Sequence, residues 1–194
     1  MNHVDEVVFI PSKENSLSPW LNGAGLTRKI AIFPSGAGIH DFVWRLSVAE
    51  IESDSLYSHF AHTHRTQMLL SGDGLELTFP HKVCVLNKQY QMVDFSGEDT
   101  VSCHLLQGPC QVLNVMTQSN VGKSEMVVLH GSYHIKTSDH LQRVFYIAQG
   151  EYEFVMSAFE SLTLRTGDAL LIKANQVIFK SVTSSAAMIE ITFH

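Results

Sequence analysis

The sequence predicts an all-β fold, and three observations support this prediction. Short runs rich in Val, Ile, Leu and Phe recur along the chain, and several alternate apolar and polar residues. Such alternation is typical of half-buried antiparallel strands. Turn sequences that contain glycine separate the runs, and no long stretch has the 3.6-residue periodicity of a helix. Short strands at this spacing indicate a β-sandwich or a jelly-roll barrel.

The predicted strands follow one another along the chain, with turn sequences between them. The eight clearest runs lie at 29–33, 43–48, 66–70, 75–79, 101–106, 112–116, 169–172 and 188–193. Glycine and aspartate at 71–74 and at 166–168 indicate tight turns. Any helix is expected to be short, near residues 12–20 or 139–142.

The two halves of the sequence resemble each other. Three matches at nearly one spacing are Gly72 with Gly150, Leu86 with Leu162, and 101–105 with 177–181. The glycines are 78 residues apart and the other two pairs are 76 residues apart. This regularity favours duplication of a small barrel, although short hairpins also resemble one another by chance.

The length of the chain, 194 residues, allows one large all-β domain or two small ones. A polar segment at 119–124 is a candidate link between the halves. We therefore expect an N-terminal barrel over residues 1–118 and a C-terminal barrel over 124–194, packed as one compact unit.

Composition excludes several classes of protein. The net charge of −6 disfavours nucleic acid as a partner, because phosphate binding requires a basic surface. No apolar run is long enough for a membrane span, and the first residues lack the order of a signal peptide. The three cysteines have no CxxC spacing, which favours reduced thiols in a cytoplasmic protein.

Ordered motifs in the first half resemble the HutD/Ves family. The matching elements are Trp20-x-Asn22-Gly23-x-Gly25-x-Thr27-Arg28-x-Ile30, Phe42-x-Trp44-Arg45-x-Ser47-x-Ala49-x-Ile51, Tyr57-Ser58-x-Phe60, Arg65, Leu69-Leu70-x-Gly72-x-Gly74-Leu75, Gly108-Pro109 and Asn114-x-Met116. The resemblance is clear over residues 17–118 and rests on pattern alone elsewhere. It implies a bicupin, that is, two cupin-like double-stranded β-helices (jelly-roll barrels) in one chain. It also implies an association with bacterial histidine-utilisation genes or with cold and stress responses.

Three positions depart from the family pattern. Lys29 stands where the family usually has an acidic residue, Val112 replaces its Asp, and Gln118 replaces its Arg. If that Asp and Arg normally belong to the pocket, this chain binds a different ligand or none.

The candidate site is a pocket for an anion. Arg28, Arg45 and Arg65 lie within the family motifs, and the planar guanidinium fork suits a carboxylate. Amide and hydroxyl side chains would orient the ligand, and tryptophan would form an apolar wall. The candidate binding residues are Asn22, Thr27, Arg28, Trp44, Arg45, Arg65, Asn114 and Met116.

Each of these residues also has a structural interpretation. Arg45 could pair with Asp41 or Glu50, Asn22 could cap a turn, and Trp44 could fill the barrel. No single residue decides between the two interpretations, and it is the combined set that favours a pocket.

Metal binding and catalysis have weaker support. Cupin metal sites use a histidine pair, a carboxylate a few residues later and a third histidine on a later strand. His62 and His64 could form the pair and His104 the third ligand of a divalent transition metal, but no carboxylate follows the pair. Arg65 places a positive charge beside it. We therefore predict no metal, no cofactor and no catalytic residue, since a GxSxG motif is also missing.

The sequence thus predicts a protein without enzymatic activity that binds a small organic acid. In the context of the family, the acid would be a histidine-degradation intermediate such as urocanate or formylglutamate, and the role would be regulatory or accessory. Two alternatives stay open. One is a metal-dependent cupin enzyme, an oxygenase or isomerase; the other is an interaction module without a ligand that forms a homodimer.

Overall fold

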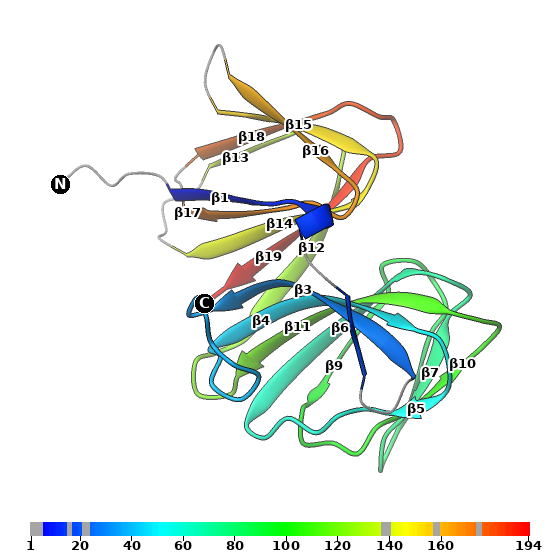
Figure 1. The fold of residues 1–194 in the computed structure, drawn as a ribbon. Helices are drawn as coiled ribbons and strands as arrows, with labels where there is room; N and C mark the ends of the chain where they lie inside the picture. Colours follow the sequence, from blue (N-terminus) through cyan, green and yellow to red (C-terminus); the bar gives the residue numbers. More distant parts are fainter. Residues whose placement is uncertain (1–5, 15–16, 21–23, 137–140, 157–159, 174–175) are drawn as a thin grey trace. The chain divides into compact units, whose positions relative to one another are not determined.

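The computed structural model describes residues 6–14, 17–20, 24–136, 141–156, 160–173 and 176–194 (Figure 1). Within these ranges the regular structure consists of nineteen β-strands and one short 3₁₀ helix, Ser12–Glu14. This confirms the all-β prediction, and each of the eight predicted strands overlaps an observed one. No helix in the described ranges has the length and apolar character needed to cross a membrane.

The chain divides into two units. The first unit is Asn15–Lys123, and the second combines Met1–Glu14 with Ser124–His194. The first unit has a six-stranded sheet in the order β2 (Leu17–Pro19), β3 (Gly25–Phe33), β4 (Trp44–Ile51), β11 (Cys110–Gln118), β6 (Thr63–Ser71) and β9 (Met92–Ser96). Its four-stranded sheet has the order β5 (Ser55–Leu56), β10 (Ser102–Leu105), β7 (Leu75–Thr78) and β8 (Val83–Leu86).

The second unit also has two antiparallel sheets. The five-stranded sheet has the order β1 (Glu6–Ile10), β17 (Ala169–Lys173), β14 (Gln142–Gln149), β19 (Ala187–Phe193) and β12 (Ser124–His130). The four-stranded sheet has the order β13 (Tyr133–Lys136), β18 (Gln176–Ser181), β15 (Glu151–Val155) and β16 (Ser161–Arg165).

The N-terminal strand differs from the predicted division, which placed residues 1–14 in the first barrel. Strand β1 pairs along its whole length with β17, from Glu6 opposite Lys173 to Ile10 opposite Ala169. The backbone N–H of Ser12 then donates to Asp168 Oδ1 at 2.8 Å. The first strand therefore extends the sheet of the second unit and pairs the free edge of β17.

The two units repeat one topology. The order β4-β11-β6-β9 of the first unit corresponds to β12-β19-β14-β17 of the second, and β5-β10-β7-β8 corresponds to β13-β18-β15-β16. The turn glycines Gly72 and Gly150 occupy equivalent places, after β6 and β14, and have φ of 101° and 77°. Only glycine adopts such angles readily. The repeat agrees with the two jelly-roll barrels of a bicupin.

Each unit has its own hydrophobic core between its two sheets. In the first unit the core includes Leu69, Leu75, Leu77 and Val112. In the second unit aromatic rings fill the equivalent space around Phe179, which is fully buried. The side chains alternate between the two faces of each strand, so that the apolar half of each pattern lies inside.

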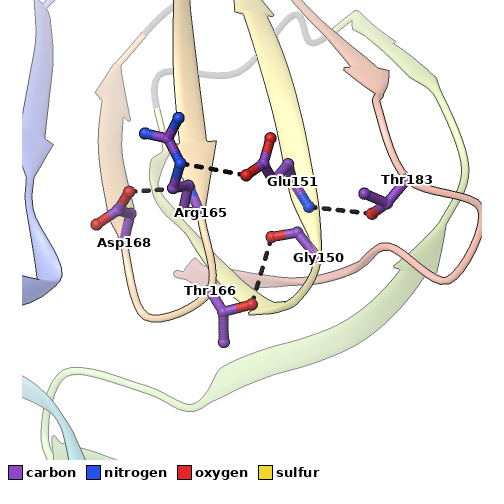
Figure 2. A network of polar contacts seen from close by, with 6 residues as sticks. All are labelled: Gly150, Glu151, Arg165, Thr166, Asp168 and Thr183. Carbon is purple, nitrogen blue, oxygen red and sulfur yellow. Dashed lines mark hydrogen bonds and ion pairs between the residues drawn. The ribbon is translucent and has the colours of Figure 1, made fainter.

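Polar contacts secure the turns at one end of the second unit (Figure 2). The Arg165 N–H donates to Asp168 Oδ2 at 2.9 Å, and the Glu151 N–H donates to Thr183 Oγ1 at 3.1 Å. The Thr166 hydroxyl donates to the carbonyl oxygen of Gly150 at 3.3 Å. These contacts satisfy backbone groups where strands end, and they are structural in character.

Candidate functional site

A cavity of about 330 Å³ lies inside the first unit, against the inner face of the six-stranded sheet. Its polar lining includes two arginines, Arg45 and Arg65, together with Ser47 and Asn114. Ser18, Thr27 and Ser58 also line it, and the aromatic and aliphatic part of the wall consists of Pro19, Trp20, Ile39, Ala49, Ile51, Tyr57, Phe60, Val112 and Met116. The cavity therefore combines positive charge with apolar surface.

Strand alternation and register place the polar residues together. On β4, Arg45 and Ser47 both point to the cavity because they are two residues apart. Met116 on β11 pairs with Arg45 on one side and with Arg65 on the other. The two arginines thus start from strands that flank β11, with about 10 Å between their backbones.

Asn114 belongs to the next row across the sheet. It pairs with Ser47 on β4 and with Gln67 on β6. The side chain of Asn114 is buried, and its Oδ1 has no hydrogen-bond partner among the described residues. The same is true of Gln67 Oε1, whereas Gln67 Nε2 donates to the Tyr57 hydroxyl at 2.9 Å. The row therefore presents hydrogen-bonding capacity that the described part of the chain leaves unused.

Arg65 is a buried cation without an acidic partner among the described residues. Its side chain is 6% exposed, and within the described ranges no carboxylate forms an ion pair with it. Nη1 donates to the carbonyl oxygen of Ser58 at 3.3 Å, while Nε has no partner there. The guanidinium lies 4.8 Å from the Phe95 ring centroid and 5.2 Å from that of Tyr57, both within cation–π range.

Burial disfavours the charged form of both arginines in the cavity and therefore lowers their pKa. The pKa of Arg65 is lowered to about 10, mainly by burial and to a smaller extent by the nearby Arg45, while Tyr57 opposes this shift. Burial also lowers the pKa of Arg45. In the described part of the chain Arg45 pairs with neither Asp41 nor Glu50, the two partners considered from the sequence. The cavity thus holds two like charges that remain protonated at neutral pH and that have no counter-ion in the part of the chain that the structure describes.

Tyr57 contributes a neutral polar group to the same wall. Burial raises the pKa of its hydroxyl well above the usual value, so that the phenol stays protonated. The ring packs edge-on against Trp20, with centroids 6.2 Å apart. Trp20 Nε1 in turn donates to Thr27 Oγ1 at 2.7 Å, which fixes the Thr27 hydroxyl.

Five of the eight predicted binding residues line this one cavity: Thr27, Arg45, Arg65, Asn114 and Met116. Asn22 lies outside the described residues. Trp44 and Arg28 are not part of the lining, because strand alternation directs them to the other face of the sheet. There Trp44 stacks on Phe33, with ring centroids 6.0 Å apart.

The predicted binding set lacks several residues of the cavity, among them Ser47, Tyr57 and Phe60, and also lacks Gln67, which pairs with Asn114. Ser47 and Gln67 each follow an arginine by two residues, so the period of a strand was a usable signal for both. Tyr57 and Phe60 belong to the family motif Tyr57-Ser58-x-Phe60, whose residue types alone do not indicate a role in binding. Only the tertiary structure places that segment against the sheet, where both line the cavity.

The three histidines of the metal alternative lie apart from the cavity and from one another. His62 precedes β6 in a turn, with φ of 54°, so it does not share a strand face with His64. His64, on β6 of the six-stranded sheet, has its Nε2 3.4 Å from Asp94 Oδ1. His104 lies on β10 of the four-stranded sheet, and its Nδ1 is 2.5 Å from Asp54 Oδ2. In the described ranges no group of three His, Cys, Asp or Glu side chains is arranged to hold a metal ion.

Comparison with known proteins places the chain in one family. The sequence model of the HutD family matches residues 12–189. An uncharacterized 21.2 kDa protein in the hutC 3′ region of Pseudomonas putida is 30% identical over 172 residues, 89% of this chain and 90% of that protein. Protein Ves of Escherichia fergusonii is 35% identical over 108 residues, 55% of this chain and 56% of Ves.

Solved structures show the same fold. HutD from Pseudomonas fluorescens SBW25 superposes with a TM-score of 0.80 at 23% identity, covering 97% of this chain and all (100%) of that one. A cupin 2 conserved barrel domain protein from Leptotrichia buccalis superposes with a TM-score of 0.57 at 11% identity, covering 88% and 89% of the two chains. Both likenesses concern the fold, which is that of the cupins.

Proposed function

The chain belongs to the HutD family, and from this premise we propose that it binds a small organic acid in the cavity of its first unit. Arg45 and Arg65 hold the carboxylate of this acid. The observation that carries the proposal is Arg65, which is buried and has neither an acidic partner nor a partner for Nε within the described ranges. The role we infer is regulatory or accessory to metabolism.

Electrostatics favours an anionic ligand. A buried charge without a counter-ion destabilises a folded protein, and a second charge of the same sign in one cavity adds to this effect. A bound carboxylate supplies the missing negative charge and accepts hydrogen bonds from guanidinium N–H groups. Binding therefore relieves an unfavourable state of the free protein.

The other residues that line the cavity limit the size and shape of the ligand. A volume of about 330 Å³ is at the lower end of the range for small-molecule sites, about 300–1,000 Å³. Trp20, Tyr57 and Phe60 offer flat apolar surface, while Asn114 and Tyr57 offer polar atoms. A compact acid with an apolar or planar body fits this combination.

The first acids to test come from the family and from a relative. The name of the Pseudomonas putida relative places it in the hutC 3′ region, and the family resemblance implies histidine utilisation. Urocanate and formylglutamate are acids of that degradation pathway. Acetate serves as the smallest probe of a carboxylate alone.

The test is isothermal titration calorimetry of the whole chain with each acid. We expect at least one acid to bind, and Arg65→Met to weaken it by about 2–5 kcal/mol, which is at least about 30-fold. Arg165→Met is the matched control, since Arg165 is an exposed arginine of the second unit. At 100 times the dissociation constant, the ligand should stabilise the fold by about 2.7 kcal/mol.

Two results would overturn the proposal. The first is that none of the acids binds the wild-type protein. The second is that Arg45→Met and Arg65→Met both bind the acid as tightly as the Arg165→Met control does.

A further inference from the structure

A shared β-bulge fixes which residues of the two units are equivalent. In the first unit Val112 pairs with Leu69, and the next pair skips Leu70. In the second unit Met188 pairs with Ile147, and the next pair skips Ala148. The bulge thus aligns the two units by geometry, without reference to residue types.

This alignment pairs the arginine of the cavity with an arginine of the second unit. Arg65 lies four residues before Leu69, and Arg143 lies four residues before Ile147. By the same count, Asn114 follows Val112 by two residues, and Glu190 follows Met188 by two. Position for position, Arg65 and Asn114 correspond to Arg143 and Glu190.

The two equivalent pairs differ in the charge that lies next to the buried arginine. In the second unit Arg143 Nε lies 3.2 Å from Glu190 Oε1, with side chains only 12% and 17% exposed. In the first unit the place of the glutamate is held by Asn114, whose neutral amide offers no negative charge. Arg143 Nε meets Glu190 Oε1 as an ion pair but not in hydrogen-bond geometry, and Arg65 Nε also makes no hydrogen bond within the described ranges, so the two arginines differ in the neighbouring charge and not in the hydrogen bonding of Nε. Asn114 Oδ1 likewise has no hydrogen-bond partner among the described residues.

The register position of Arg45 also differs in charge between the two units. Arg45 pairs with Met116, which pairs with Arg65, and the matching row in the second unit is Glu125, Thr192 and Arg143. The first unit therefore carries two positive charges at these register positions. The second unit carries one positive and one negative charge there.

We propose that Asn114 keeps the arginine of the first unit open to an external carboxylate, by occupying the place that Glu190 fills with an internal one. The inference rests on the proposed function and deepens it, because it identifies the bound group and its location. The carboxylate of the ligand approaches Nε of Arg65 from the side of Asn114. Asparagine is one methylene shorter than glutamate, which leaves room for this group.

The experiment compares Asn114→Glu with Asn114→Gln in the whole chain. The two side chains have nearly the same size, so the difference between the variants reports the carboxylate charge alone. We expect Asn114→Glu to melt at a higher temperature than Asn114→Gln without ligand, because the new carboxylate neutralises Arg65. We also expect Asn114→Glu to bind the acid at least about 10-fold more weakly than Asn114→Gln does.

The outcomes separate this inference from the proposed function. If the wild-type protein binds an acid but the two variants melt and bind alike, Asn114 does not have the role proposed here. If the wild-type protein binds neither urocanate, formylglutamate nor acetate, the proposed function and the external carboxylate fail together. In that case a higher melting temperature for Asn114→Glu still shows that the position accepts an internal carboxylate.

Discussion

The two barrels of this chain share strand order, bulge and turn glycines, yet their interiors differ at one end. In the first unit the row beside the arginine contains Asn114 and Gln67, and it borders a cavity. In the second unit the same row contains Glu190 and Phe145, and Phe145 packs against Phe179 with ring centroids 4.8 Å apart. At these positions, among the described residues, the second unit has an aromatic ring and an internal ion pair, while the first unit has a cavity and two positive charges.

The comparison shows that residues outside the apolar core can change between the two barrels while the fold is kept. The apolar residues that join the sheets are present in both units, so each barrel is supported by a core of its own. The polar row is not required for that core, because the second unit replaces most of it. With two barrels in one chain, one barrel can retain a destabilising arrangement of buried positive charges beside a cavity, while the other barrel has an internal ion pair.

The largest expected effect tests whether the second interior is filled and the first is not. Phe179→Ala removes a ring that contacts Phe145, Tyr152 and Phe154, and we expect it to lower the free energy of unfolding by about 3–5 kcal/mol. For Met116→Ala we expect a smaller decrease in the free energy of unfolding than the usual loss of about 2–5 kcal/mol, because Met116 already borders a cavity. Urea unfolding measures both. A loss for Met116→Ala as large as that for Phe179→Ala would contradict the comparison.

The next effect concerns the two equivalent arginines, because only the substitution of Arg143 should destabilise the ligand-free protein. Arg143→Met removes the cation beside Glu190 and should destabilise the ligand-free protein by about 1–3 kcal/mol. Arg65→Met removes a buried cation that has no acid, and should leave the protein equally stable or more stable. Thermal and urea unfolding without ligand provide the measurement. Destabilisation of similar size in both variants would show that Arg65 is structural.

A smaller effect appears in the dependence on pH. The pKa of Arg65 in the folded protein is about 10, below the ordinary value of an arginine side chain. Between these values the unfolded chain binds more protons, so the stability of the free protein should rise with pH; below pH 10 the destabilising effect is complete. Affinity for the acid should fall across the same range.

Subtracting the values of Arg65→Met isolates this contribution from the other groups that titrate in alkali. Unfolding curves and titrations at pH 8, 9, 10 and 10.5, with both proteins, are sufficient. An affinity that does not change up to pH 10.5 would show that the charge of Arg65 does not hold the ligand.

The smallest effect is expected for an arginine of the second unit that lies at its surface. Arg165 Nε lies 3.2 Å from Glu151 Oε1, but its side chain is 65% exposed (Figure 2). Arg165→Gln should change the free energy of unfolding by less than about 1 kcal/mol, since water and salt screen such pairs. The difference should disappear in high salt. A loss equal to that of Arg143→Met would mean that burial does not distinguish the two pairs.

Much of the fold could be predicted because its signals are local. Runs such as 66–70 and 112–116 alternate with the period of a strand, and glycines such as Gly72 mark the turns. The pairing of β1 with β17 could not be found in this way, since its partners are more than 150 residues apart. No local pattern indicates which distant edge a strand will join.

The candidate site shows the same division. Arg45, Arg65 and Asn114 stood out as polar residues in β-type runs, and their motifs resemble one family. Even the equivalence of Arg65 and Arg143 was available, since each precedes its turn glycine by seven residues. The error in Trp44 and Arg28 came from treating neighbours in a motif as neighbours in space, although strand neighbours face opposite sides.

Local sequence patterns were sufficient for the eight clearest strands, the turns, the resemblance between the two halves and several residue types of the site. These follow from periodicity and from side-chain chemistry, which each short segment carries on its own. Only the tertiary structure decided that Arg143 lies beside Glu190, whereas Arg65 faces a cavity without an acid among the described residues. The physical reason is that neutralisation of a charge depends on distance through space, and residues far apart in the chain set that distance.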